Sequence, residues 1–530
     1  MCMLLEISNA HLAVAARTLI EIDHLEIHKG DRIGLIGKNG SGKTTFLQAI
    51  LNNEMFEKGE VNIFTTIDLL PQLKQQIGSK SGGEITQNYI QQAFTLKHEL
   101  LLADEPTTHL DKQHIEWVEK TFKHWQGAFV VVSHDRSFLD TVCNKVWELD
   151  QQRITEYKGN YQQYQKQKKL ELLHHQTEYE KYQSKKQQLE RALRLKNEKA
   201  ARATKKPKNV STSEASITGA KPYFAKKQKK LQQTSKSIET RLEKLEKVDK
   251  PYEEKALKMS LPQQEKISGR TIIRVENLDG RIGNITLWEK ANFHVKGGDK
   301  VAIIGNNGSG KTTLIRKLLN QSNEVQFSPS CQIAYFKQDL SILNSDTSIL
   351  ENIMADSLYK ETLIRTVLAR LHFYREDVHK KVDVLSGGEK VKVTLAKIFL
   401  SNSNTLLLDE PTNFLDIEAT EALEQLLIEY EGTILFVSHD RRFVERVATK
   451  IVEIKEKKMI SFDGDYREYL LNRMVPTEHD DTKDKLLAVE TKITEVLGRL
   501  SIEPSEQLEK EFQDLLKKKQ RLSNRRNNEQ

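Results

Sequence analysis

The chain contains Gly37-Lys38-Asn39-Gly40-Ser41-Gly42-Lys43-Thr44 and, much later, Gly305-Asn306-Asn307-Gly308-Ser309-Gly310-Lys311-Thr312. Both stretches have the pattern G-x-x-x-x-G-K-T. Each follows an apolar run, Ile33 to Ile36 in the first copy and Val301 to Ile304 in the second, and each precedes a helix-like pattern. This order predicts a strand, a loop and a helix at both places. The chain is therefore expected to have an α/β fold that occurs twice.

The pattern is that of a P-loop, which binds the phosphates of a nucleotide. Its glycines let backbone N–H groups curl around a phosphate at the positive end of a helix. Its lysine reaches the outer phosphates, and the following threonine hydroxyl binds Mg²⁺. The predicted nucleotide-binding residues are Gly37, Asn39, Gly40, Gly42, Lys43, Thr44 and Thr45 in the first copy, and Gly305, Asn307, Gly308, Gly310, Lys311, Thr312 and Thr313 in the second.

Length and composition limit the possible classes of protein. A chain of 530 residues implies roughly two to four domains. The three cysteines are scattered without a C-x-x-C pair, which argues against a disulfide framework or a zinc site and fits a reducing cytosol. No apolar run approaches the ~18 residues of a membrane span, and no signal peptide is expected at the N-terminus. The net charge of +7 is compatible with a polyanionic partner.

The internal repeat sets the expected architecture. Lys43 is 38 positions before Ser81, whereas Lys311 is 75 positions before Ser386, so the first copy lacks most of an insertion that the second carries. Each copy alternates strand and helix patterns, which predicts a mainly parallel sheet with covered faces. The expected domains are a first α/β domain at 1–157, a helical linker at 158–270, a second α/β domain at 271–475 and a helical C-terminal extension at 476–530.

The linker has the pattern of a two-helix antiparallel hairpin. Apolar residues recur at steps of seven, four and three, as in a coiled-coil seam. Between the two helical parts, residues 207–224 contain two prolines, a glycine and small polar residues, so the tip is expected there. The seam residues are Tyr179, Tyr182, Leu189 and Leu193, followed by Leu231, Ile238, Leu242 and Leu245.

The tip region is strongly basic. Residues 196–230 hold eleven Lys or Arg against two Glu. Such a run is either a solvated helical face or a prong that binds phosphate backbones, and the second interpretation is favoured. Tyr223 and Phe224 either staple the hairpin or contact bases. The candidate RNA-binding residues are Lys205, Lys206, Lys208, Ser213, Ser216, Lys221, Tyr223 and Phe224.

Each P-loop is followed by the same ordered set of motifs. The first copy continues with Gln72, Ser81-Gly82-Gly83-Glu84, Asp104-Glu105 at the end of an apolar run, and Ser133-His134-Asp135-Arg136. The second continues with Gln338, Ser386-Gly387-Gly388-Glu389, Asp409-Glu410 and Ser438-His439-Asp440-Arg441. Both acidic pairs open an E-P-T-x-x-L-D string.

These motifs resemble those of the ATP-binding cassette (ABC) ATPases, over both repeats. The resemblance implies ATP and Mg²⁺ as cofactors, and no other metal. It also implies that two cassettes of one chain pair head to tail, so that each P-loop faces the S-G-G-E signature of the other cassette. The cofactor-binding set then includes Gln72, Ser81, Gly82, Gly83, Gln338, Ser386, Gly387 and Gly388.

The resemblance also implies chemical roles. Glu105 and Glu410 would activate the attacking water, and His134 and His439 would contact the γ-phosphate. The residues implied in Mg²⁺ binding are Thr44, Gln72, Asp104, Thr312, Gln338 and Asp409. Two features depart from the family pattern. Lys80 replaces the usual leucine before the first signature, and no aromatic residue stands about 25 positions before either P-loop to stack on adenine, where His11 and Ile282 lie.

The spellings E-P-T-x-x-L-D and S-H-D-R, together with a basic hairpin between fused cassettes, resemble the ABC-F family. These are cytoplasmic translation factors that bind the tRNA exit site. The strings at 203–209 and 219–225 are similar to those of the Vga-type antibiotic-resistance group. The resemblance implies a bacterial 70S ribosome, with its 23S rRNA and P-site tRNA, as partner, and protection against lincosamides, pleuromutilins and streptogramin A.

Three other classes share parts of this pattern. A general ABC-F factor that relieves stalled translation has the same catalytic motifs. A transporter ATPase is disfavoured because the fused cassettes carry no membrane spans. A DNA-repair or chromosome-organising ATPase would bring zinc cysteines or a far longer coiled coil. Salt-sensitive binding to ribosomes and not to duplex DNA would favour an ABC-F protein over the other two classes.

Overall fold

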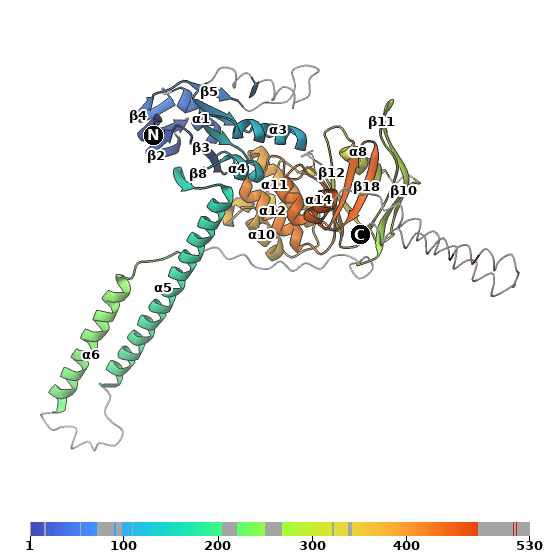
Figure 1. Cartoon of the computed structure of the whole chain (residues 1–530). Coiled ribbons are helices and arrows are strands. Elements are labelled where there is room, and N and C mark those ends of the chain that lie inside the picture. Colours follow the sequence, from blue (N-terminus) through green and yellow to red (C-terminus); the bar gives the residue numbers. More distant parts are fainter. Residues whose placement is uncertain are drawn as a thin grey trace.

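Figure 1 shows the computed structural model of the chain, in which two α/β units pack together and a helical hairpin projects from them. The structure describes residues 2–14, 17–52, 55–71, 90–91, 98–108, 110–203, 220–249, 268–320, 323–337 and 342–474, and residues 512 and 516. The α/β unit from β1 to β9 is called the first cassette here, and the unit from β10 to β18 the second cassette.

The first cassette combines a parallel sheet with an antiparallel layer. Its elements are β1 (Met3–Val14), β2 (Arg17–His28), β3 (Arg32–Gly37), α1 (Lys43–Leu51), β4 (Phe56–Ile63), β5 (Ile67–Leu70), β6 (Leu100–Asp104), α3 (Lys112–Lys123), β7 (Ala128–Val132), α4 (Arg136–Val142), β8 (Lys145–Asp150) and β9 (Arg153–Lys158). The strands lie in the order β4-β1-β2-β9-β8-β3-β7-β6-β5. The pairs from β5 to β8 are parallel, and β6 and β7 are buried throughout, as expected for a covered parallel sheet.

The second cassette repeats this plan with an added helical layer. Its elements are β10 (Thr271–Ile282), β11 (Ile285–Lys296), β12 (Lys300–Gly305), α8 (Lys311–Leu319), β13 (Val325–Phe327), β14 (Ile333–Phe336), α9 (Ile349–Met354), α10 (Glu361–Arg370), η4 (Arg375–His379), η5 (Val382–Val384), α11 (Gly387–Phe399), β15 (Thr405–Asp409), α12 (Ile417–Glu429), β16 (Thr433–Val437), α13 (Arg441–Val447), β17 (Lys450–Lys455), β18 (Lys458–Asp463) and α14 (Tyr466–Met474). The sheets run β11-β10-β13 and β14-β15-β16-β12-β17-β18.

The P-loop strands hold the same place in both cassettes. β3 lies between β7 and β8, and β12 lies between β16 and β17. The carboxyl ends of these parallel strands meet at one edge of each sheet, where ligands of open α/β sheets bind. The acidic pairs that end β6 and β15 therefore lie beside the P-loops.

The linker forms two helices, α5 (Tyr161–Ala203) and α6 (Ala220–Glu243), which pack against each other and project away from the cassettes (Figure 1). The predicted seam residues are partly buried along the pair, while most of their neighbours are exposed. One boundary was predicted wrongly: α6 begins at Ala220, so residues 220–224 are helical and do not belong to the turn. A proline in a first helical turn, here Pro222, lacks only an N–H that the helix does not use.

Several predictions fall outside the described residues. They are Gln72, the first signature (Ser81 to Glu84), Gln338, most of the predicted tip (Lys205, Lys206, Lys208, Ser213 and Ser216 among it) and nearly all of the C-terminal extension. Within the described part of the chain, no helix has both the length and the apolar character needed to cross a membrane.

Candidate active sites at the cassette interface

Both P-loops hold their lysine in the same way. The ammonium of Lys43 donates to the carbonyls of Gly37 and Lys38 at 2.7 and 2.9 Å. The ammonium of Lys311 donates to the corresponding carbonyls at 2.9 and 3.1 Å. Burial lowers the pKa of both lysines, but nearby carboxylates favour the charged form, so a cation points along each loop.

Glycine is required at the start of each P-loop helix. Gly42 and Gly310 cap α1 and α8 with φ values of 104° and 99°, in the left-handed region that side chains disfavour. At Gly310 a Cβ would also lie 2.5 Å from the ring of Trp288. The backbone can thus present its N–H groups to a phosphate at the N-terminus of each helix.

The threonine and aspartate predicted to bind Mg²⁺ are in contact. The Thr312 hydroxyl donates to Asp409 at 3.2 Å, and in the first cassette the Thr44 hydroxyl hydrogen-bonds to Asp104. Burial raises the pKa of both aspartates. A hydroxyl and a carboxylate side by side are hard oxygen ligands of the kind that Mg²⁺ prefers, so the residues present fit this ion.

The glutamate after each aspartate has a strained backbone. Glu105 and Glu410 have φ values of 52° and 50°, an uncommon conformation for a residue with a side chain. Their N–H groups donate to Val132 and Val437 of the neighbouring strand at 2.9 and 3.0 Å. The same strain at the same motif position in both cassettes indicates that the direction of the carboxylate matters.

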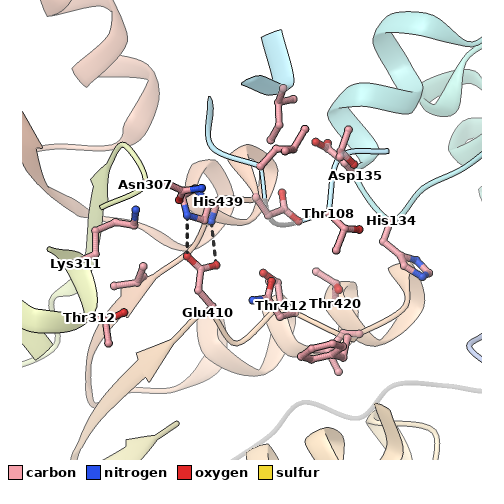
Figure 2. Close-up of a pocket in the computed structure, with 18 of the residues that line it drawn as sticks. Thr108, His134, Asp135, Asn307, Lys311, Thr312, Glu410, Thr412, Thr420 and His439 are labelled. Carbon is pink, nitrogen blue, oxygen red and sulfur yellow. Dashed lines mark hydrogen bonds and ion pairs between the residues drawn. The ribbon is translucent and has the colours of Figure 1, made fainter. Parts of the chain in front are cut away.

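Each glutamate faces the histidine of the S-H-D-R motif, as Figure 2 shows for Glu410 and His439. The backbone N–H of His439 donates to Glu410 at 3.3 Å, and the ring Nε2 lies 3.3 Å from the other carboxylate oxygen. His134 and Glu105 repeat both contacts at 3.4 Å. The structure thus brings the four predicted catalytic residues together in two matching pairs.

The second pair has strongly shifted acidities. Burial raises the pKa of Glu410 to about 7, and burial with the nearby Lys311 charge lowers the pKa of His439 to about 4. At neutral pH His439 is therefore uncharged, and Glu410 exists in both protonation states. A carboxylate with this pKa is well matched to accept a proton from water.

One aspartate joins each P-loop to the opposite cassette. Asp111 caps α3 by accepting from His114 N–H and also accepts from Asn307 N–H of the second P-loop at 3.3 Å. Asp416 caps α12 and accepts from Asn39 N–H of the first P-loop at 3.2 Å. Asp111 and Asp416 are the last residues of the two E-P-T-x-x-L-D strings, and the sequence pattern gave them no role. The available signal was an aspartate immediately before a helix in both copies.

The second signature faces the first P-loop. Ser386 caps α11 and exchanges hydrogen bonds with Glu389, which explains the serine and the glutamate of the motif. A Cβ on Gly388 would lie 3.2 Å from the amide nitrogen of Asn39, and that amide donates to the Phe414 carbonyl at 2.8 Å. The N-terminus of α11 therefore points at the first P-loop, as head-to-tail pairing requires. The first signature, which would face the second P-loop, lies outside the described residues. On that side of the interface the contact described is the one between Asp111 and Asn307.

A cavity of about 450 Å³ lies at the second site, between the two cassettes (Figure 2). Its size is in the range of small-molecule sites, roughly 300–1,000 Å³. Lys311, Thr312 and Glu410 line it from one side, and Thr108 and His134 from the other. The buried hydroxyls of Ser41 and Ser309, one in each P-loop, have no hydrogen-bond partner among the described residues, which fits a phosphate acceptor beside them.

The positions expected to carry an adenine-stacking ring carry no aromatic residue. Ile282, at the end of β10, lines the cavity and is 56% exposed, whereas His11 lies within β1. Val14 ends β1 as Ile282 ends β10, and it is 47% exposed. Ile282 and Val14 are thus equivalent positions, and neither has a ring to stack on adenine.

The candidate RNA-binding residues that the structure describes are remote from both sites. Lys221, Tyr223 and Phe224 lie in the first turns of α6, at the far end of the hairpin from the cassettes (Figure 1). A role for them has to be exerted away from the nucleotide.

Comparison with known proteins agrees with this geometry. A family model described as "ABC transporter" matches residues 20–78 and 288–413. The chain is 33% identical to the ribosome protection protein VmlR of Bacillus subtilis over 97% of both chains. It is 36% identical to the erythromycin resistance ATP-binding protein MsrA of Staphylococcus epidermidis, over 82% of this chain and 94% of that protein.

Among solved structures, a protein named RNase-L Inhibitor matches with a TM-score of 0.58 at 18% identity, over 88% of this chain and 92% of that chain. An archaeal ribosome recycling factor, aABCE1, crystallised with the ribosomal stalk protein aP1, matches with the same TM-score at 16% identity and the same coverage. These likenesses show the fold: paired nucleotide-binding domains in one chain. On these relatives and the geometry of the two sites, the chain belongs to the ABC-F family of ATPases and hydrolyses ATP.

Proposed function

We propose that this protein is an ATP-dependent ribosome-protection factor. The observation that carries the proposal is a long basic helical hairpin held between two paired ATPase cassettes, in a chain related along its whole length to a ribosome protection protein. We infer that it acts in the cytoplasm as a monomer, with bacterial 70S ribosomes, 23S rRNA and P-site tRNA as partners.

The length of the hairpin supports this proposal. α5 has 43 residues and is about 65 Å long at about 1.5 Å per residue. A prong of this length can reach from the tRNA exit site along a P-site tRNA toward the peptidyl-transferase centre. Its basic tip suits a path between phosphate backbones.

Each site contains residues for phosphate binding, Mg²⁺ binding and water activation. Lys43 and Lys311 bind the outer phosphates, and Asp104 and Asp409 with their threonines would hold Mg²⁺. The bound ion would supply charge neutralisation at the phosphates. Glu105 and Glu410 accept a proton from the attacking water, and the histidines orient these carboxylates. Asp111 and Asp416 tie each P-loop to the opposite cassette, so nucleotide binding favours the closed pair.

Closure then has a mechanical consequence in this proposal. The closed form docks at the exit site, and the tip displaces the tRNA and reshapes the drug site. Hydrolysis releases the protein. Closure is favoured only as far as ATP and the ribosome bind the closed state more tightly than the open one. We further infer a place in the Vga-type group, with protection against lincosamides, pleuromutilins and streptogramin A.

Expression in a susceptible Gram-positive host tests the proposal. Inhibitory concentrations of these three drug classes should rise several-fold with the wild-type chain and not with the Glu105→Gln, Glu410→Gln double variant. Bulky substitutions at Ser213 and Ser216 should change the drug preference while ribosome co-sedimentation stays normal. Ribosome binding without any resistance would instead favour a general ABC-F translation factor.

Salt dependence tests the basic tip separately. Replacing Lys205, Lys206 and Lys208 with alanine should weaken ribosome association and flatten its dependence on salt, because fewer counterions are released. Alanines at Lys455, Lys457 and Lys458, which are exposed at the β17–β18 turn, provide a charge-matched control. An unchanged salt dependence in the tip variant would show that these lysines form a solvated helical face and do not bind phosphates.

A further inference from the structure

Acidic residues of α12 contact the first P-loop at the start of this helix and the base of the linker further along it. At the start of α12, Asp416 accepts from Asn39 N–H, and Glu418 lies 3.6 Å from the Lys38 ammonium. Glu421 and Glu424 follow at three-residue spacing, each about one turn after the acidic residue before it. A single helix of the second cassette thus contacts the first nucleotide site at one end and residues beyond it along its length.

Glu421 meets the first turns of α5. The side-chain amide of Gln165 donates to Glu421 at 2.5 Å, and the hydroxyl of Tyr161 donates to the same carboxylate oxygen at 3.4 Å. The same oxygen lies 3.6 Å from the guanidinium of Arg136, the last residue of the first S-H-D-R motif. Tyr161 is 1% exposed, and burial followed by the Glu421 charge raises its pKa well above the usual range, so it stays a neutral donor.

A cation of the second cassette also contacts this tyrosine. The guanidinium of Arg442 lies over the Tyr161 ring, 5.4 Å from its centroid. Arg442 stands three positions after His439, which faces Glu410 at the second site. The base of α5 is therefore in contact with segments that belong to both nucleotide sites.

The base of α5 is also fastened to its own cassette. The Tyr164 hydroxyl donates to Glu148 of β8 at 2.7 Å, and the Lys168 ammonium donates to the same carboxylate at 2.6 Å. These two contacts hold α5 on the first cassette, and the Glu421 contacts hold it on the second. A change in the position of one cassette against the other has to alter one of these sets.

The helix α14 of the second cassette is the equivalent of the base of α5 and can be compared with it. Tyr466, Tyr469 and Arg473 on α14 stand 305 positions after Tyr161, Tyr164 and Lys168. The Arg473 guanidinium pairs with Glu453 at 3.2 Å, as Lys168 pairs with Glu148. The contacts that cross to the other cassette differ, because Leu470 stands at the position of Gln165 and Ser137 at that of Arg442. A leucine cannot donate to a carboxylate, and a serine has no cation for a ring, so only α5 carries this crossing pair.

We propose that Tyr161 and Gln165 are positioning residues which, through Glu421, fix the direction of the linker when the cassettes close on nucleotide. Neither residue is part of the phosphate or metal machinery, so they act on the linker and not on the chemistry. A tilt of about 5° at the base of a helix this long moves its far end by about 6 Å. The geometry of the tip is thus sensitive to contacts at the base.

The inference rests on the proposed function only for the reason why the direction of the linker matters. The direction itself can be measured without ribosomes. The probe is a distance distribution between spin labels on the full chain, at Gln187 on α5 and Lys360 before α10, both exposed. The three native cysteines are replaced, and Glu105→Gln with Glu410→Gln traps bound ATP. With ATP the distribution should be narrow and without ATP broad.

The test variant is Tyr161→Phe with Gln165→Leu, which places the α14 residue at position 165 and keeps the side-chain bulk. Losing hydrogen bonds to a carboxylate should raise the population of misdirected linkers at least about tenfold, seen as a broad distribution with ATP. In the background without the glutamate substitutions, ATPase activity without ribosomes should stay within about twofold. Tyr466→Phe with Leu470→Gln is the matched control and should leave the distribution narrow.

Three results would overturn the inference: a narrow distribution in the test variant, broadening in the control to the same extent, or a matching loss of ATPase activity that marks a general defect of the interface. Absence of ribosome binding by the wild-type chain would count against the proposed function and leave this measurement untouched.

Discussion

The guanidinium of Arg136 and the carboxylate of Glu424 form an ion pair across the cassette interface, and both side chains are almost fully buried, at 1% and 0% exposure. Arg136 is the last residue of the first S-H-D-R motif, and Glu424 lies on α12 of the second cassette. The equivalent pair, Arg441 with Glu119, is more open, at 27% and 13% exposure with 3.7 Å between the charged atoms. The interface has therefore one tight and one looser copy of the same contact.

We predict that Arg136→Met destabilises the paired cassettes by up to roughly 3 kcal/mol, because it leaves a buried carboxylate with fewer partners. Arg446, which also pairs with Glu424 at 2.7 Å, limits the loss. Arg441→Met should cost clearly less, since partly exposed pairs are worth about 1 kcal/mol or less. Denaturant unfolding of both variants measures the difference. Equal destabilisation would contradict the unequal burial of the two pairs.

We predict that Glu105→Gln with Glu410→Gln still binds ATP but hydrolyses it at least about 100-fold more slowly, because the amide keeps the shape and cannot accept the proton. Single-turnover hydrolysis and nucleotide binding are measured together. Glu99→Gln, at an exposed carboxylate remote from both sites, is the control. The trapped double variant should accumulate on ribosomes and inhibit growth. Turnover at the wild-type rate would exclude both glutamates as bases.

Much of this arrangement could be predicted from local sequence. The P-loops, the acidic pairs that end β6 and β15, and the long helix from Tyr161 follow from motif spacing and periodicity, because they are set by neighbours in the chain. The contact partners of Asp111 and Asp416 could not be predicted. An aspartate before a helix indicates a cap, and only the folded interface shows that the same carboxylate also holds the opposite P-loop.

The backbone strain at Glu105 and Glu410 could not be predicted from the sequence either. Nothing in a strand-ending D-E pair indicates a left-handed residue, because the conformation is imposed by the neighbouring strand and the loop that follows. The start of α6 was misplaced for the opposite reason. A proline in this pattern predicts a turn, whereas Pro222 lies in the first turn of α6, where a proline is compatible with a helix.

We predict that Ile282→Tyr strengthens binding of ATP at the second site. A ring at the mouth of the cavity can stack on the base, and such stacking is worth about 1–3 kcal/mol, so the Kd should fall about tenfold. Val14→Tyr should do the same at the first site. Titration with fluorescent ATP and GTP analogues measures both. Phe64 of the first cassette, which is 60% exposed and does not line the cavity of the second site, gives a control in Phe64→Tyr. Unchanged affinities would show that the base does not lie against β10.

The last prediction concerns pH. Burial, and then the charge of the nearby Asp440, raises the pKa of Asp135 to about 6, above the ~3.9 of an unfolded aspartate. Between these values the folded state binds a proton that the unfolded state has released. The contribution of Asp135 to stability therefore decreases as the pH rises from about 4 to about 6, and it stays at its least favourable value above that window.

Asp135→Asn removes this dependence and keeps the cap of α4, because the amide oxygen can still accept from the backbone N–H groups of Ser137 and Phe138. The melting temperature of the variant relative to the wild type should increase from pH 5 to pH 7 and then remain constant to pH 8. Asp440, Glu119 and Arg441 also act on this carboxylate, and they are present in both proteins, so their charges cancel in the difference. A difference that is flat over this range, or that falls with rising pH, would show that Asp135 is already ionised in the folded protein at pH 5 without cost.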